Sequence, residues 1–155
     1  MLLTELITHP SQVVIDLKAT DRWQAIDELV AVLVEHARLP ESEAEAVVAA
    51  VRDREQMMST GIGHGIGIPH APSEHVDAVQ GVLGIARHDV EFDAMDGEPV
   101  RLVMLFVVPK DQFQNHLDTL ADIARVLSNG DIRKSLRAAA SEAEVLDIIR
   151  AAGAK

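Results

Sequence analysis

Two kinds of hydrophobic pattern follow one another along the chain. Apolar residues at every third or fourth position predict helices over residues 21–38, 41–53, 111–128, 131–139 and 141–152. Short apolar runs with β-branched residues predict strands at 13–17, 57–60, 79–87 and 101–108. The run at 101–108, RLVMLFVV, is almost continuously apolar, which indicates burial on both faces of a sheet. The alternation of the two patterns predicts an α/β fold.

Capping residues set several of the expected helix ends, and Thr20 or Asp21 is expected to cap the helix that runs to about Arg38. Asp111 with Gln114 forms an N-terminal pair for the helix over 111–128, and Ser141 with Glu144 forms a capping box for the last helix. The buried stripe expected on the helix over 111–128 is Phe113, Leu117, Leu120, Ala124 and Leu127.

Composition narrows the class of protein. The 155 residues suit a single domain over residues 1–155, with an aliphatic core because only 3% of the chain is aromatic. The absence of cysteine excludes disulfides, thiolate metal sites and cysteine nucleophiles. A formal net charge of −11 argues against nucleic acid and anionic membrane as partners. Without a signal-peptide pattern or a membrane-spanning run, we expect a cytoplasmic protein with no direct membrane insertion.

The stretch GIGHGIGIPHAP, residues 61–72, combines glycines, histidines and prolines. Its glycines indicate backbone that bends unusually or approaches another group closely. Pro69 and Pro72 fix their own φ angles and favour extended backbone at the preceding residues, Ile68 and Ala71. The composition predicts a pliant loop that becomes rigid around His70.

Several familiar chemistries do not match this stretch. The glycine spacing yields no GxGxxG fingerprint, no Walker A sequence occurs, and no GxSxG elbow is present. A zinc site made of His64, His70 and His75 is conceivable, although no HExxH or other ligand spacing supports it. We therefore predict no cofactor and no metal.

Among the chemistries considered, a histidine that acts as a nucleophile still fits this stretch. The lone pair of a neutral imidazole can attack a phosphoryl group. Negative charge then spreads over the three phosphoryl oxygens in the transition state, so hydrogen-bond donors and cations must already be in position to stabilise it. The surroundings of His70 offer these donors: the Arg54 guanidinium, the Ser59 and Thr60 hydroxyls and the Gly61, Gly63 and Gly65 backbone. His116 lies near the start of the helix that follows the strongest strand, where ligands gather in α/β sheets. A half-buried His116 bonded only to a backbone carbonyl is the alternative.

Two segments of the chain resemble a known family. The run REQMMSTGIGHGIGIPHA, residues 54–71, is similar to the signature of the IIA components of the phosphoenolpyruvate-dependent sugar phosphotransferase system, fructose–mannitol type. This type includes a nitrogen-related regulatory branch. The run NHLDTLADIA, residues 115–124, is the second matching segment. The resemblance implies a type-2 EIIA domain with a mixed parallel/antiparallel sheet and helices on both faces.

The resemblance also implies roles for individual residues. His70 would be the phosphorylated histidine, and His116 a second active-site histidine that orients it and binds the phosphoryl group. Arg54 would stabilise the phosphoryl group and contact the partner, with Ser59 and Thr60 as the matching hydroxyl pair. His64 departs from the family, in which asparagine, lysine or a similar polar residue is expected.

Three functions stay open from the residues. The first is a phosphocarrier that takes its phosphoryl group from a histidine phosphocarrier protein and passes it to a IIB component. The second is a regulatory module that docks on a target protein in one phosphorylation state. The chain end soon after Ala152 favours it slightly. The third is a metal-binding protein using His64, His70 and His75.

Overall fold

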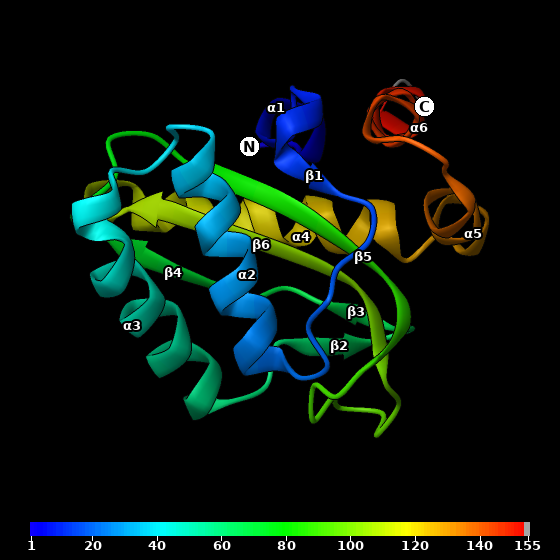
Figure 1. Ribbon diagram of the computed structural model, residues 1–155, viewed down its shortest axis with the longest axis horizontal. Helices are drawn as coiled ribbons and strands as arrows, with labels where there is room; N and C mark the ends of the chain where they lie inside the picture. Colours follow the sequence, from blue (N-terminus) through cyan, green and yellow to red (C-terminus); the bar gives the residue numbers. More distant parts are fainter. Residues whose placement is uncertain (154–155) are drawn as a thin grey trace.

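The computed structural model describes residues 1–153, with the side chains of residues 113–115 left aside. Within these residues the strands form one six-stranded sheet (Figure 1). The strands are β1 (Val13–Val14), β2 (Gly61–Gly63), β3 (Ile66–Gly67), β4 (His70–Ser73), β5 (Gln80–Val90) and β6 (Val100–Pro109). Their order is β1-β5-β6-β3-β2, and β4 also pairs with β6, beyond β3 along the strand. The β5–β6 and β2–β3 pairs are antiparallel and the others parallel, which confirms the predicted mixed sheet.

Helices cover both faces of this sheet, as predicted (Figure 1). The α-helices are α1 (Leu3–Leu6), α2 (Arg22–Glu35), α3 (Glu41–Met57), α4 (His116–Leu127), α5 (Gly130–Ala138) and α6 (Glu142–Gly153). Two short 3-10 helices are η1 (Pro10–Gln12) and η2 (Lys110–Asn115). Helices α2 and α3 cover one face, while α1, α4, α5 and α6 lie on the other.

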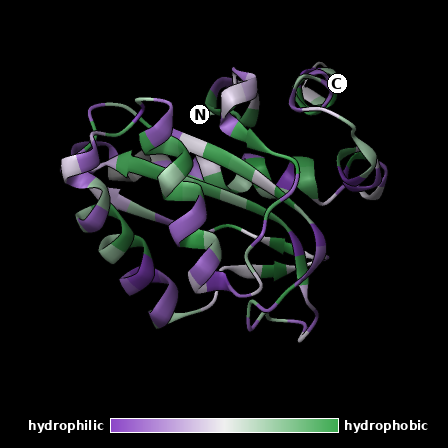
Figure 2. Ribbon diagram, in the orientation of Figure 1, coloured by the Kyte–Doolittle hydropathy of each residue, from purple (hydrophilic) through white to green (hydrophobic). Residues whose placement is uncertain are grey.

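Strand β6 contributes to the core on both of its faces. Val103, Leu105 and Val107 pack in the cluster below α2 and α3. Met104 and Phe106 pack in the cluster below α4, α5 and α6. Figure 2 shows the resulting pattern, with hydrophobic ribbon along β5 and β6 and hydrophilic stretches on the outer helices. The apolar run therefore forms a doubly buried strand, as predicted.

The glycine-rich stretch is built of strands, so the predicted pliant loop is wrong. Strands β2 and β3 form a hairpin whose turn has positive φ angles at Gly63 (100°), His64 (57°) and Gly65 (76°). Such angles are accessible to glycine at little cost. At Gly67, a Cβ atom would lie only 2.7 Å from the Phe92 ring. Turn geometry and close packing explain these glycines.

Four other sequence predictions need correction. The strand expected at 57–60 does not form because α3 continues to Met57, and the strand at 13–17 shortens to β1. The helix expected over 111–128 begins as η2 and turns into α4 at His116. Its predicted stripe is wrong at Leu117, which is 65% exposed, because α4 turns Ile123, Leu127 and other residues inward. Phe113 and Gln114 lie outside the described side chains.

Local caps are confirmed where they can be checked. Asp21 accepts a hydrogen bond from the N–H group of Gln24 (2.8 Å) and starts α2. Ser141 accepts from the N–H group of Glu144 (3.2 Å), which is one half of the predicted capping box. The Glu144 carboxylate accepts from the N–H group of Ala140 (2.9 Å) and not from that of Ser141, so the second half differs. Among residues 1–153, no helix combines the length and hydrophobicity that a membrane span requires. The cytoplasmic location stays a prediction.

Candidate active site

His70 is held in a nearly buried position at the start of β4. It pairs in register with Phe106 of β6, and it is only 5% exposed. Its imidazole stacks on the Phe106 ring, with 5.0 Å between ring centroids and 8° between ring planes. The expectation of a loop residue is therefore wrong, since the strand and the stacked ring fix this side chain.

The hydrogen bond of His70 determines which nitrogen can react. Its Nδ1 lies 2.8 Å from the carbonyl oxygen of Ile68. A carbonyl only accepts, so Nδ1 carries the proton and the lone pair belongs to Nε2. The hydrogen bond thus orients the imidazole and leaves Nε2 as the nitrogen with an available lone pair.

The surroundings keep this imidazole neutral. Burial lowers the pKa of His70 to about 4, because the charged form loses its hydration. The bond to Ile68 acts in the opposite direction, and the positive charges of Arg54 and His116 lower the pKa further. At neutral pH, the Nε2 lone pair is therefore available.

His116 lies beside His70 in space. It is the first residue of α4, and its half-buried ring is 5.8 Å from the His70 ring, with an interplanar angle of 27°. The chain reaches this point after leaving the end of β6 through η2. The predicted pairing of the two histidines is therefore present in the fold.

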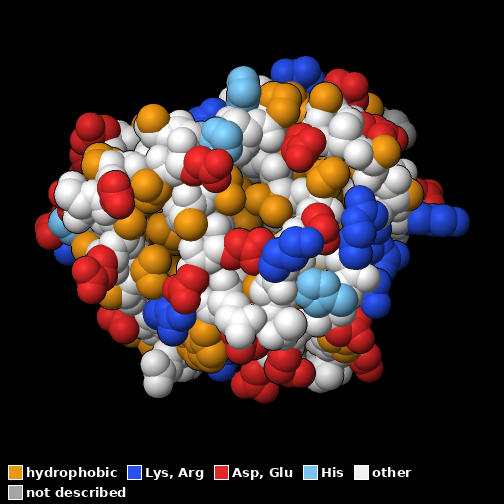
Figure 3. Space-filling view, viewed as in Figure 1, with side chains coloured by type: hydrophobic (Ala, Val, Ile, Leu, Met, Phe, Trp, Pro, Cys, Tyr) orange, Lys and Arg blue, Asp and Glu red, His pale blue; other side chains and the backbone are white. Residues whose placement is uncertain are grey.

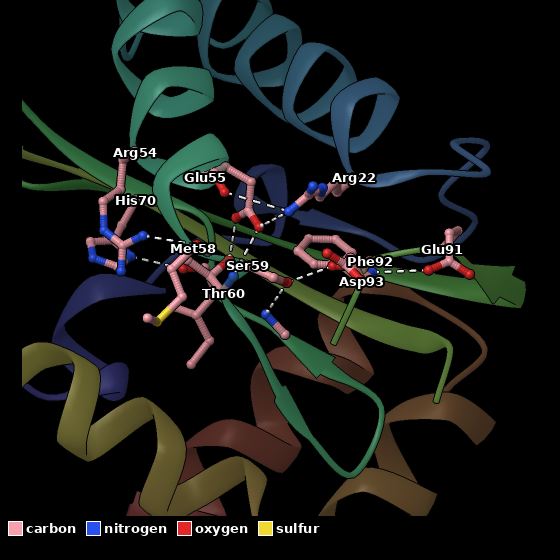
Figure 4. A network of polar contacts seen from close by, with 12 residues as sticks. Arg22, Arg54, Glu55, Met58, Ser59, Thr60, His70, Glu91, Phe92 and Asp93 are labelled. Atoms are coloured by element: carbon pink, nitrogen blue, oxygen red, sulfur yellow. Dashed lines mark hydrogen bonds and ion pairs between the residues drawn. The ribbon is translucent and has the colours of Figure 1, made fainter. Parts of the chain in front are cut away.

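Arg54 approaches His70 from helix α3. It lies in the last turn of α3, and its Nη1 donates to the carbonyl oxygen of Met58 (3.0 Å). Figure 4 shows its side chain extending from α3 toward the imidazole. Its charge acts on the His70 pKa, as the two groups are close. A cation is thus present beside the His70 imidazole.

The two hydroxyls predicted to bind phosphate are directed elsewhere. Ser59 Oγ donates to the carbonyl of Phe92 (2.5 Å) and accepts from the N–H group of Gly61 (3.1 Å). Thr60 Oγ1 donates to the carboxylate of Glu55 (2.5 Å). Because a hydroxyl has a single proton, neither has one left for a phosphoryl group.

The glycine turn is also remote from His70. The carbonyl oxygen of Gly65 accepts from the N–H groups of Arg101 and Leu102, whereas His70 lies opposite Phe106. Leu102 and Phe106 are separated by about 13 Å along the strand. The structure therefore does not bring the turn residues Gly63 and Gly65 to His70.

A residue that the sequence analysis missed is Glu55, which is fully buried. Its carboxylate accepts from the Thr60 N–H group (2.9 Å) and from Arg22 Nη1 (3.2 Å), in addition to the Thr60 hydroxyl (Figure 4). Glu55 thereby holds Thr60 in place at the end of the segment that follows α3. The same segment contains Met58, whose carbonyl oxygen accepts from Arg54. Helical spacing could have revealed this residue, because Glu55 follows Val47 and Val51 at intervals of four on the buried face of α3. A carboxylate buried on such a face requires hydrogen-bond or ionic partners.

The three histidines of the metal hypothesis do not converge. His75 Nδ1 contacts Glu43 Oε2 at 2.5 Å, and His64 lies in the β2–β3 turn. In the part of the chain that the structure describes, no three His, Asp or Glu side chains are grouped as metal ligands. The geometry around His70 instead suits an anion.

Comparison with known proteins identifies similar chains. Residues 6–152 match the family described as "Phosphoenolpyruvate-dependent sugar phosphotransferase system, EIIA 2". The fructose-specific EIIABC component of Bacillus subtilis is 33% identical over 149 residues, which are 96% of this chain but only 23% of that protein. The nitrogen regulatory protein IIA-Ntr of Neisseria meningitidis has 30% identity and a TM-score of 0.83, covering 95% of this chain and 98% of that one.

A more distant likeness concerns the fold alone. A structure of the complex of enzyme IIAMTL and phosphorylated enzyme IIBMTL from Escherichia coli has 20% identity and a TM-score of 0.78. The likeness covers 94% of this chain and 98% of that chain.

Proposed function

The chain belongs to the EIIA 2 family of the phosphoenolpyruvate-dependent sugar phosphotransferase system, and we propose that it carries a phosphoryl group on Nε2 of His70. The observation that supports this most strongly is the neutral, oriented imidazole of His70. A fixed nucleophile with an available lone pair meets the first requirement of phosphoryl transfer.

The proposed step is an in-line displacement. The Nε2 lone pair forms a bond to the phosphorus of a phosphohistidine on the donor protein, while the donor's own N–P bond breaks. The donor imidazole leaves with that electron pair. Positive charge develops on the His70 ring and is shared by its Nδ1–H group. The hydrogen bond from this group to the Ile68 carbonyl oxygen stabilises that charge. No metal or nucleotide takes part in this step.

Arg54 and His116 are the proposed stabilising groups. The guanidinium of Arg54 would donate to the phosphoryl oxygens, whose negative charge grows in the transition state. His116 lies close enough to contact a phosphoryl group bound between the two rings. Ser59, Thr60 and Gly61 act indirectly in this proposal, because they shape the segment beside Arg54.

The exposed side chains next to the site suit a protein partner. Met58 is 67% exposed beside the carbonyl that binds Arg54, and Leu117 is 65% exposed beside His116. Exposed apolar groups around a reactive atom favour docking of another protein. We propose a histidine phosphocarrier protein as donor, with a IIB component as recipient in a cytoplasmic relay.

A regulatory role is the second candidate. It is favoured by the likeness to IIA-Ntr of Neisseria meningitidis, which is named as a nitrogen regulatory protein. A phosphoryl group on His70 would change the charge of the same docking surface and so change which target binds. Transfer from the phosphorylated chain to a IIB protein would support the transport role. Binding to a target in one phosphorylation state without transfer would support the regulatory one.

Intact-protein mass spectrometry tests the proposal. After incubation with phosphoenolpyruvate, enzyme I and a histidine phosphocarrier protein, the native chain should gain one acid-labile phosphoryl group. His70→Ala should gain none, whereas the matched control His64→Ala should behave as the native chain. Circular dichroism would verify that His70→Ala is folded, since the variant loses a packed ring. Unchanged phosphorylation of folded His70→Ala would refute the assignment.

A further inference from the structure

A second concave site lies at the end of β6 that is remote from His70. It has a volume of about 280 Å³ and lies between the β2–β3 turn, the β5–β6 connection and α5. We call it the α5 pocket, and its polar lining includes His64, Asp96, Glu98, Arg101, Arg133 and Arg137. None of these residues takes part in the proposed phosphoryl transfer.

Arginines gather at this pocket although the chain carries a net charge of −11. Arg133 and Arg137 are separated by one turn of α5, so both lie on the same side of the helix. Arg133 Nη1 donates to the carbonyls of Leu127 (3.0 Å) and Ser128 (2.7 Å), which fixes its guanidinium. Figure 3 shows basic side chains collected on the side of the molecule where β5 approaches α5. The α5 wall of the pocket is therefore cationic.

Two of the nearby carboxylates are already occupied. Asp89 forms an ion pair with Arg101 (2.9 Å), and both residues line the pocket. Asp96 accepts from the N–H groups of His64 (3.3 Å) and Glu98 (3.1 Å). Among residues 1–153, no hydrogen bond or ion pair involves the Glu98 carboxylate or the Arg137 guanidinium. One unpaired anion and one unpaired cation thus line the same pocket.

The β2–β3 turn forms a preformed rim. His64 has a φ angle of 57°, a left-handed conformation that is uncommon outside glycine. Its N–H bond to Asp96 ties this turn to the β5–β6 connection. The same connection carries Glu98, whose backbone N–H group also donates to Asp96 and whose side chain lines the pocket. A preformed site loses less entropy when it binds a ligand.

We propose that the α5 pocket binds a small zwitterion, by chemical class a free α-amino acid. Its carboxylate would bind Arg133 and Arg137, and its ammonium group would bind Glu98. The carboxylates of Asp96 and Glu98 in the same lining would repel a phosphate dianion, whereas a zwitterion offers an ammonium group to Glu98 and a carboxylate to the arginines of α5. The pocket is at the small end of the range of about 300–1,000 Å³ for ligand sites, which suits a molecule of this size.

A titration followed by ¹H–¹⁵N NMR tests this proposal on the whole chain. The probes are the common free L-amino acids, added one at a time. At least one should shift the amide signals of residues 63–65, 96–98 and 133–137 saturably, with a Kd of about 1 mM or below. The N-acetyl derivative and the methyl ester of that amino acid each lack one charge, and neither should bind.

Variants identify the charges involved. Arg137→Gln and Glu98→Gln should each weaken binding about tenfold, because each removes one charged hydrogen bond. Lys134→Gln is the matched control on α5, since Lys134 does not line the pocket, and it should leave binding unchanged. The proposal is overturned if no amino acid shifts these signals saturably, or if Arg137→Gln binds as tightly as the native chain. Inorganic phosphate shifting them where amino acids fail would also overturn it.

Discussion

His64 and His70 belong to one glycine-rich stretch but lie at well-separated positions along β6, near Arg101 and opposite Phe106 respectively. His64 is exposed in a left-handed turn tied to Asp96. His70 is buried at the start of a strand, stacked on Phe106 and bonded to Ile68. Nearly identical local composition therefore surrounds two histidines with different chemistry. The difference comes from residues brought by the sheet, so it is a property of the tertiary structure.

The pH dependence of stability should distinguish the two histidines most clearly. The pKa of His70 is lowered from 6.5 to about 4 in the folded chain, so only the unfolded chain binds this proton between those values. The free energy of unfolding should therefore fall as the pH falls from 6.5 to about 4. The shift corresponds to at most about 3 kcal/mol. Urea denaturation across this pH range measures it.

The matched variants for this measurement are His70→Gln and His64→Gln. The slope due to His70 should be absent from the first variant and retained in the second. Equal slopes in both variants would show that the environment of His70 does not control its protonation.

Arg54→Gln should slow the phosphorylation of His70 about 100-fold, because a preplaced donor to the developing charge is lost. Quenched-flow phosphorylation followed by mass spectrometry gives the rate. Arg52→Gln is the control on the same helix, since Arg52 pairs with Asp27 instead. If both variants slow phosphorylation equally, the effect comes from general charge and not from the position of Arg54.

Glu55→Gln should lower the free energy of unfolding by about 2 kcal/mol, because a buried charged partner of Arg22 and Thr60 is lost. Chemical denaturation at neutral pH measures this change. Glu45→Gln replaces an exposed carboxylate of α3 and should be nearly neutral. A neutral Glu55→Gln would mean that the buried network does not stabilise the segment beside Arg54.

His116→Ala should have the smallest effect, a reduction of about tenfold in the phosphorylation rate at an unchanged final stoichiometry. The expected cause is the loss of one group beside the phosphoryl group, while the acceptor itself remains. His75→Ala, on the loop after β4, serves as the control. A rate equal to that of the native chain would remove His116 from the proposed mechanism.

Sequence patterns predicted the parts of the fold that local forces determine. The long apolar runs became β5 and β6, and Asp21 and Ser141 cap helices as expected. The β2–β3 hairpin was missed because its glycines resemble a loop, while its pairing with β6 is a contact distant in sequence. Leu117 was misplaced because η2 changes the helical register before α4.

The grouping of candidate residues around His70 was predictable from the sequence, but the residues that hold them in place were not. His70, His116 and Arg54 were expected from chemistry and from family resemblance. Glu55 was missed because its partner Arg22 comes from another helix, and one sequence does not reveal that contact. Ser59 and Thr60 were expected to bind phosphate, but acceptors from Phe92 and Glu55 occupy their hydroxyl protons.

The most direct test of the central proposal is a long-range ¹H–¹⁵N NMR spectrum of the phosphorylated chain. It reports which imidazole nitrogen carries phosphorus. The structure leads us to expect phosphorus on Nε2 of His70, with Nδ1 still protonated and bonded to Ile68. Phosphorus on Nδ1 of His70, or on His64, would contradict this account.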